Sequence, residues 1–137
     1  MRDNLARLFY ADGDTRRLEL VVDLKPPIFV ESPAPLPHLA RHFEHLNVNQ
    51  QEAMQKVLDA QDYTMILGMP GTGKTTVIAA IIKVLVGMGK TVLLTSYTHS
   101  AVDTILMKLK ENADFGILRI GNVDKVILQS VRRWHQF

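Results

Sequence analysis

The run from Gly68 to Thr75 has residue types and spacing that can hold the phosphates of a nucleotide. It reads Gly-Met-Pro-Gly-Thr-Gly-Lys-Thr and fits G-x-x-x-x-G-K-[ST], a loop whose backbone N–H groups wrap a nucleoside triphosphate. We call it the P-loop. We expect Lys74 to place its charge on the β- and γ-phosphates and the Thr75 hydroxyl to ligate Mg²⁺. Both residues are therefore candidates for the chemistry of triphosphate cleavage.

The other residues of the P-loop suit close approach to an anion. Gly68, Gly71 and Gly73 carry no Cβ that would obstruct the phosphate oxygens, and Pro70 stiffens the loop. The helix that follows would face the anion with its unpaired N–H groups and the positive end of its dipole. The predicted nucleotide-binding residues of the loop are Gly68, Pro70, Gly71, Thr72, Gly73, Lys74, Thr75 and Thr76. The alternative, a glycine turn that only precedes a helix, does not account for the Lys-Thr pair.

A second polar run, residues 95–103, contains side chains suited to nucleic acid. The hydroxyls of Thr98 and Ser100 can bind a phosphate backbone. Tyr97 and His99 can stack on unpaired bases, as many single-strand binders do. The alternative is a Ser/Thr-rich turn that only caps a helix, and local chemistry does not decide between the two.

A metal site is an alternative use of three histidines. His38, His42 and His45 have the spacing of one helical face, which an exposed helix explains equally well. The chain contains no cysteine, so no thiolate ligand or disulfide can come from these residues.

Alternating strands and helices are expected to position the two polar runs. Strands are predicted at 63–67, 91–96 and 116–121, and helices at 50–58, 76–86 and 100–110. Asn47 or Asn49 can cap the first helix, and Gly87-Met88-Gly89 ends the second. This order implies an α/β fold with a parallel sheet, whose ligands bind at the carboxyl ends of the strands.

The first 45 residues differ from the rest. Residues 18–22 alternate partly like a strand until Lys25-Pro26-Pro27 stops it. Pro33, Pro35 and Pro37 favour an extended connector. A proline-rich partner site is the alternative to a plain linker here.

Composition sets broad limits. With 137 residues the chain is one domain or a piece of one. A formal net charge of +2 is too small to argue for nucleic acid by itself. No signal peptide and no membrane span are visible, so we expect an intracellular, soluble protein without a membrane partner.

Together these residues resemble superfamily 1B helicases. The resemblance rests on Gln50 ahead of the P-loop, on the P-loop itself and on the string from Ser96 to Asp103. Within that superfamily the chain is similar to the eukaryotic DNA replication ATP-dependent helicase/nucleases, which have a similar string followed by a run like 118–121. The resemblance covers residues 46–125 well and residues 18–30 more weakly.

The resemblance implies a fold and residue roles. Residues 46–137 would be the incomplete N-terminal part of a RecA-like P-loop NTPase motor domain, and residues 1–45 a connecting segment that leads into it. Gln50 would read the adenine base of ATP through its side-chain amide. The implied nucleic-acid contacts are Thr98, His99, Ser100 and Arg119. A polar helix residue and a surface arginine are the alternatives for Gln50 and Arg119.

The resemblance also implies a function. A helicase/nuclease of this family would use ATP and Mg²⁺ to move along single-stranded DNA in replication and repair. It would act in the nucleus or the mitochondrion, with a single-strand-binding protein as a candidate partner. The family's iron–sulfur cluster, nuclease carboxylates, Asp-Glu pair and arginine finger have no counterpart in this sequence. We therefore expect a fragment that binds nucleotide and hardly hydrolyses it.

Three other functions stay open at this point. An RNA helicase of the nonsense-mediated-decay type would share the same arrangement of motifs. A nucleotide-dependent binding module would bind ATP without catalysis. A P-loop phosphotransferase would act on an unrelated acceptor, although Gln50 and the run 95–103 argue against it.

Overall fold

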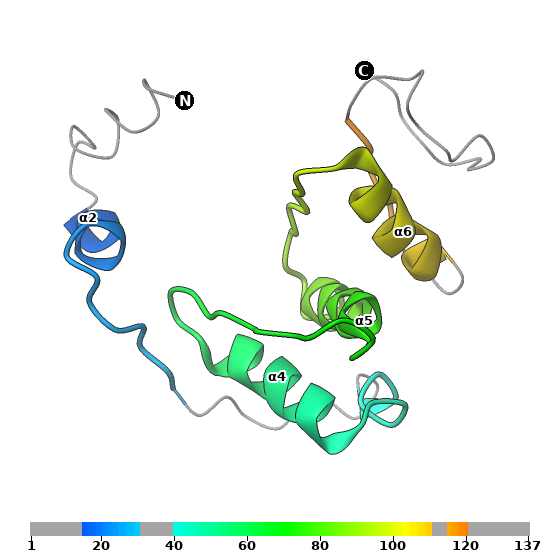
Figure 1. The fold of residues 1–137 in the computed structure, drawn as a ribbon, viewed down its shortest axis with the longest axis horizontal. Helices are drawn as coiled ribbons and strands as arrows, with labels where there is room; N and C mark the ends of the chain where they lie inside the picture. The colour runs from blue at the N-terminus through cyan, green and yellow to red at the C-terminus, as the bar shows by residue number, and fades with distance from the viewer. Residues whose placement is uncertain (1–14, 31–39, 111–114, 121–137) are drawn as a thin grey trace.

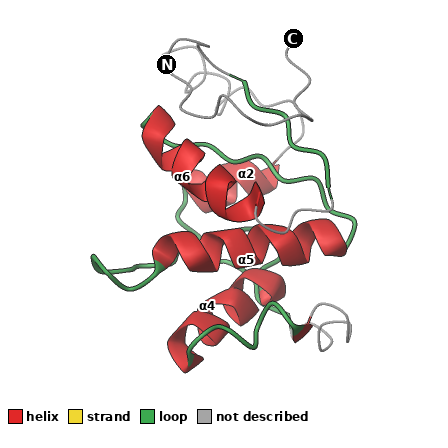
Figure 2. Ribbon diagram, turned by 90° about the vertical axis from the view of Figure 1, so that its right-hand side faces the viewer, coloured by secondary structure: helices red, strands yellow, loops and turns green. Residues whose placement is uncertain are grey.

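Four helices lie within residues 15–30, 40–110 and 115–120, the parts of the chain that the computed structural model describes. They are α2 (Thr15–Val21), α4 (Val48–Asp59), α5 (Lys74–Gly87) and α6 (His99–Lys110). Figure 1 shows α5 between α4 and α6, with α2 apart from this group. The same order of α6, α5 and α4 is seen in Figure 2.

Helix α4 begins with a reciprocal cap. The side chain of Asn47 accepts a hydrogen bond from the backbone N–H of Gln50 at 2.9 Å. In return Gln50 Oε1 accepts one from the backbone N–H of Asn47 at 3.1 Å. This capping box satisfies two N–H groups at the helix start. It confirms the predicted helix and selects Asn47 over Asn49 as its cap.

Helix α5 is apolar on both sides because it packs against two helices. Its side toward α4 contributes to one buried cluster, made of Leu46, Met54, Ala80 and Val84. Its side toward α6 contributes to a second buried cluster, made of Ala79, Ile82, Ile105, Leu106 and Leu109. The helix ends before Gly89, which adopts φ +77°, a conformation that glycine takes without strain. The predicted second and third helices are both confirmed.

The predicted parallel sheet is not confirmed. Within the described residues there is no strand, and the antiparallel contact between Phe29 and Ala60 is an isolated bridge. Residues 63–67, 91–96 and 116–120 follow no regular hydrogen-bonding pattern. A strand is defined by its hydrogen bonds to a neighbouring strand. Residues with strand propensity were therefore not enough to predict a sheet here.

Side chains in these segments still alternate as they would in a strand. Val92, Leu94 and Ile117 pack against the cluster between α5 and α6. Leu93, between the first two, is 87% exposed. The period of two residues is that of extended backbone, and one face of each segment is covered by the helices.

The strand predicted at residues 18–22 is wrong, because these residues belong to α2 or follow its end. An ion pair between Arg16 and Glu19 at 3.2 Å joins successive turns of this helix. Helix α2 ends at Val21, ahead of Pro26 and Pro27. Partial alternation of apolar residues was too short to distinguish a strand from a helix.

Residues 28–30 run beside the end of α4. The backbone N–H of Val30 donates to Asp59 O at 2.9 Å, and that of Gln61 donates to Ile28 O at 2.9 Å. The carboxylate of Asp62 accepts two hydrogen bonds from Arg16, at 2.6 and 3.1 Å. These hydrogen bonds lower the pKa of Asp62 below its ordinary value. These hydrogen bonds attach the described residues before α4 to the end of that helix and the turn after it.

Several expectations concern residues outside the described ranges. The three prolines of the predicted connector and His38 lie there. His42 and His45 lie in a turn and not on a helix, and in the described part of the chain no three His, Cys, Asp or Glu side chains gather at a metal-binding distance. None of the described helices combines the length and the hydrophobicity that a bilayer span requires.

Candidate nucleotide and nucleic-acid site

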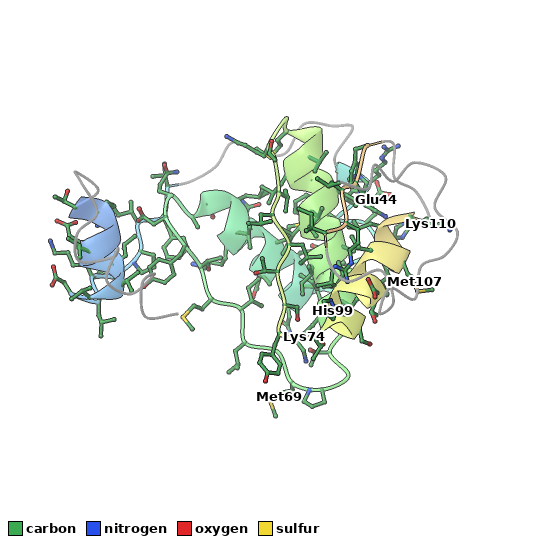
Figure 3. The ribbon with its side chains drawn as sticks, turned by 90° about the horizontal axis from the view of Figure 1, so that it is seen from above. Glu44, Met69, Lys74, His99, Met107 and Lys110 are labelled. Carbon is green, nitrogen blue, oxygen red and sulfur yellow. The ribbon has the colours of Figure 1, made fainter. Side chains whose placement is uncertain are left out.

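The P-loop folds around the side chain of Lys74. Lys74 Nζ donates to the carbonyl oxygens of Gly68 and Met69, at 2.8 and 2.7 Å. The Thr72 hydroxyl donates to Met69 O at 2.8 Å. Figure 3 shows Lys74 beside Met69 at this loop. The ammonium group therefore lies within the curve of the loop that would hold the phosphates. Lys74 is exposed to solvent, so it can exchange the two carbonyl oxygens for phosphate oxygens.

Glycine is required at two positions of the loop by different neighbours. A Cβ at Gly68 would lie 2.7 Å from Cγ and Cδ of Lys74. A Cβ at Gly73 would lie 2.8 Å from Nε2 of Gln50, and the backbone of Gly73 has φ +78°. The loop thus closes on Lys74 from one side and on Gln50 from the other, so a side chain at either glycine would have to displace one of them.

Gln50 connects the start of α4 to the P-loop. Its Nε2 donates to Thr72 O at 3.0 Å, while its Oε1 completes the capping box with Asn47. A glutamine at the third position of a helix after an Asn cap is the sequence signature of such a box. That signature could have assigned Gln50 a structural role from sequence, and it was missed.

The donor set fits a magnesium-bound triphosphate. Gly68, Gly71 and Gly73 carry no Cβ, so the loop backbone can approach phosphate oxygens closely. Lys74, Thr75 and Thr76 form the first turn of α5, where N–H groups and the helix dipole favour an anion. The Lys74 ammonium is then a mobile counter-charge, and the Thr75 hydroxyl an oxygen ligand of the kind Mg²⁺ prefers.

Thr76 has a partner that sequence reasoning did not find. Lys108 Nζ, from the last turn of α6, donates to the Thr76 hydroxyl at 2.7 Å. The two residues are 32 positions apart, so no local pattern signals the contact. It ties α6 to the first turn of the helix that follows the P-loop.

The second polar run leads into α6 and is exposed. Thr98 caps the helix, since its Oγ1 accepts a hydrogen bond from the backbone N–H of Ala101 at 3.3 Å. Tyr97 is fully exposed, at 104% of its reference area, and the side chains of His99 and Ser100 also face solvent. Capping by Thr98 leaves its own O–H free to donate. The cap and the nucleic-acid interpretation are thus compatible.

Arg119 is not a free surface arginine in this state. Its Nε donates to Asp103 Oδ1 at 3.1 Å, with side chains 11% and 2% exposed. Its two terminal nitrogens contact Ile120 O and His99 Nδ1. Direct contact of Arg119 with DNA therefore stays a prediction. The buried carboxylate of Asp103 was missed, because a pair 16 residues apart has no sequence signature.

The contacts of the described residues form two groups. One joins Gln50 to the P-loop, and the other joins His99 to Asp103 through Arg119. The hydrogen bond from Lys108 of α6 to Thr76, in the first turn of α5, links the two sides of the site. Helices α5 and α6 connect them through their shared buried cluster.

Comparison with known proteins places this site in a family. Residues 45–136 match the model of an AAA domain. The chain belongs to this AAA domain family. The match covers the P-loop and α4 to α6, so the described site is part of a P-loop NTPase domain. The prediction of that domain type is confirmed, while its sheet is not.

The chain is similar to replication helicases of distant eukaryotes. It is 53% identical over 119 residues to the DNA replication ATP-dependent helicase/nuclease DNA2 of Saccharomyces cerevisiae, covering 85% of this chain and 8% of that protein. It is 45% identical over 130 residues to the Homo sapiens protein of the same name, covering 90% and 12%. The helicase/nuclease JHS1 of Arabidopsis thaliana is 43% identical over 136 residues, covering 96% and 10%. The predicted resemblance is confirmed, and the chain spans about a tenth of the length of these relatives.

Proposed function

We propose that this chain is the ATP-binding portion of a DNA helicase/nuclease that couples ATP hydrolysis to translocation on single-stranded DNA in replication and repair. The observation that carries the proposal is the hydrogen bond from Gln50 Nε2 to Thr72 O. It holds at the phosphate loop the side-chain amide to which the resemblance assigns recognition of adenine. The similarity to helicase/nucleases agrees with this role.

The amide of Gln50 keeps the groups that recognise adenine. A glutamine amide has two N–H donors and two acceptor lone pairs. The hydrogen bonds to Thr72 and from Asn47 use one of each. One donor and one acceptor remain, which is the pair that an amide uses with N7 and the N6 amine of adenine. Gln50 can thus bind the base without releasing the helix cap or the loop.

The remaining loop residues take their roles from chemistry. Lys74 would leave the carbonyls of Gly68 and Met69 for the more strongly charged β- and γ-phosphates, since hydrogen bonds between charged groups are the stronger ones. Thr75 would ligate Mg²⁺, which when bound neutralises charge on the phosphates. Backbone N–H groups of the loop, with Thr72 and Thr76, would hold the rest of the triphosphate. An iron–sulfur cluster has no thiolate ligand in this sequence.

Single-stranded DNA is the proposed partner of the second polar run. The helix start at α6 combines hydroxyl donors at Thr98 and Ser100 with an exposed ring at Tyr97, which suits phosphates and unpaired bases respectively. We further propose a RecA-like arrangement in which the three extended segments pair as parallel strands, and action in the nucleus, with the mitochondrion as the alternative. A single-strand-binding protein is a candidate partner of the whole protein.

The proposal is tested by titrating the chain with Mg-ATP and Mg-GTP and measuring ATP turnover with and without DNA. We expect preference for ATP, negligible turnover, and loss of at least about tenfold in affinity for Lys74→Ala, since a charge-assisted contact contributes about 1.5–3 kcal/mol. Lys90→Ala, at an exposed position after α5, is the matched control. Gln50→Ala should bind both nucleotides alike.

Three results would count against the proposal. Unchanged ATP affinity in Lys74→Ala would remove the P-loop assignment, and equal affinity for ATP and GTP in the wild type would remove the role of Gln50. Tighter binding of an RNA strand than of the same DNA sequence would favour an RNA helicase instead.

A further inference from the structure

The guanidinium of Arg119 is held from three directions. Its Nε donates to the buried carboxylate of Asp103 at 3.1 Å, and one terminal nitrogen donates to Ile120 O. The other terminal nitrogen lies 3.2 Å from Nδ1 of His99. The side chain of Asp103 is 2% exposed and that of Arg119 11%. A fixed planar group is therefore aimed at one particular nitrogen of the imidazole.

This contact determines which nitrogen of His99 carries its proton. A guanidinium has only donors and keeps all of its protons in proteins. Nδ1 of His99 must therefore accept, so it carries no proton. In a neutral imidazole with an accepting Nδ1, the proton is on Nε2. The partner of one ring nitrogen thus fixes the hydrogen-bonding character of the other.

The donor at Nε2 lies where an anion is favoured. His99 is the first residue of α6 and is exposed, and Figure 3 shows it at the start of that helix. Thr98 on one side and Ser100 on the other offer hydroxyl donors, and the helix dipole adds a positive potential. These surroundings suit a phosphate oxygen better than a base edge.

We infer that Arg119 is a positioning residue, held by Asp103, that orients His99 so that its Nε2–H is a donor to a phosphate of the bound single strand. The inference rests on the proposed function, because it names how that site recognises its strand. It gives His99 the role of a hydrogen-bond donor, distinct from that of a stacking platform. In this role Arg119 acts through His99, in place of the direct strand contact that the resemblance implies.

The tautomer is measured first, without any ligand. Nitrogen-15 NMR of the imidazole distinguishes a ring protonated at Nε2, at Nδ1 or at both. We expect the Nε2–H form in the wild type and a mixture of tautomers in Arg119→Lys, because one ammonium cannot reproduce the fork that serves Asp103 and His99 together. Binding of Mg-ATP at the P-loop, which does not contact Arg119, shows that each variant is folded.

Strand binding is then measured with a labelled oligothymidine over a range of salt concentrations. His99→Ala should weaken binding by about tenfold or more, the effect of one hydrogen bond to an ionised acceptor. The slope of log K against log salt should stay unchanged, whereas loss of a cationic phosphate contact would reduce it by about 0.7 for a single strand. His99→Gln, whose amide can place an N–H near the position of Nε2, should keep most of the affinity.

A double-mutant cycle separates positioning from general damage. If Arg119 acts through His99, Arg119→Lys should weaken binding in the wild type and have no further effect in His99→Ala. Equal weakening in both backgrounds would overturn the inference. The pair His99→Gln and His99→Ala leaves Asp103 and Arg119 intact, so it remains informative even where Arg119→Lys does not fold.

The two proposals fail in different ways. A wild type that binds the strand with a proton on Nδ1, or on both ring nitrogens, would overturn the role of Arg119 and leave the proposed function standing. A wild type with the Nε2–H form that binds no strand would remove the ligand assigned to His99 and the proposed function with it.

Discussion

Substitution of Gly73 by alanine tests whether Gln50 and the P-loop are built as one unit. Gly71 is its internal control, because the two glycines have nearly the same backbone, with φ +80° and +78°. A Cβ at Gly71 would meet nothing within 4 Å, whereas one at Gly73 would lie 2.8 Å from Gln50 Nε2. The two variants therefore share the backbone cost and differ only in the collision with Gln50.

The magnitudes follow from these contacts. An alanine at positive φ costs about 1–2 kcal/mol, which is the whole expected loss for Gly71→Ala. Gly73→Ala must also displace the Gln50 amide, which loses its hydrogen bond to Thr72, worth about 0.5–1.5 kcal/mol. Disturbance of the capping box with Asn47 adds up to about 1 kcal/mol. We therefore expect Gly73→Ala to be about 1–2 kcal/mol less stable than Gly71→Ala.

The assay is urea unfolding of the nucleotide-free chain, with the free energy of unfolding compared among the variants. Gln50→Ala removes the atom that the new Cβ would meet. In that background the loss caused by Gly73→Ala should shrink to the loss seen for Gly71→Ala. Equal destabilisation by Gly71→Ala and Gly73→Ala in the wild-type background would refute the reasoning, as would failure of Gln50→Ala to reduce the difference.

Three further predictions concern the core and the ion pairs. Met54→Ala should lower the free energy of unfolding by about 2–5 kcal/mol, because the side chain is fully buried between α4 and α5; Met107→Ala, at an exposed position, is the control. Asp103→Ala should cost about 3–5 kcal/mol in urea unfolding by leaving Arg119 buried without its partner, and Arg119→Met in the same chain should restore part of it. Asp62 has a lowered pKa through its hydrogen bonds from Arg16, so its contribution is present above its ordinary pKa of about 3.9 and is lost as pH falls through the folded value. Wild type and Asp62→Asn should therefore converge in stability below about pH 4; a constant difference across that range would contradict it.

The helices were predictable because their signals are local. Asn47 lies directly before the apolar pattern of α4, and Gly87-Met88-Gly89 follows that of α5. Caps and stops act within a few residues, so the chain carries them in readable form. The P-loop was predictable for the same reason, since its turn and its helix start are contiguous.

The contacts that orient the site were not predictable. Lys108 reaches Thr76 across 32 positions, and Arg119 reaches Asp103 across 16. Such pairs depend on how helices and segments meet in space, which periodicity does not specify. A buried Asp is also unexpected from composition, because carboxylates are rarely buried unless they are paired. The sequence predicts which residues carry chemistry, and it does not indicate which contacts orient them.

The extended segments explain why strand propensity can be right while no sheet is seen. Val92, Leu94 and Ile117 face the helices and are half-buried, whereas Leu93 is 87% and Ile120 is 77% exposed. In an antiparallel sheet with one solvated face, the outward positions would be polar. Here both faces are apolar, which is the composition of strands covered by helices on both sides. The helices α5 and α6 cover one face of these segments, and the apolar residues on the other face are exposed. A parallel sheet therefore stays a proposal for these residues.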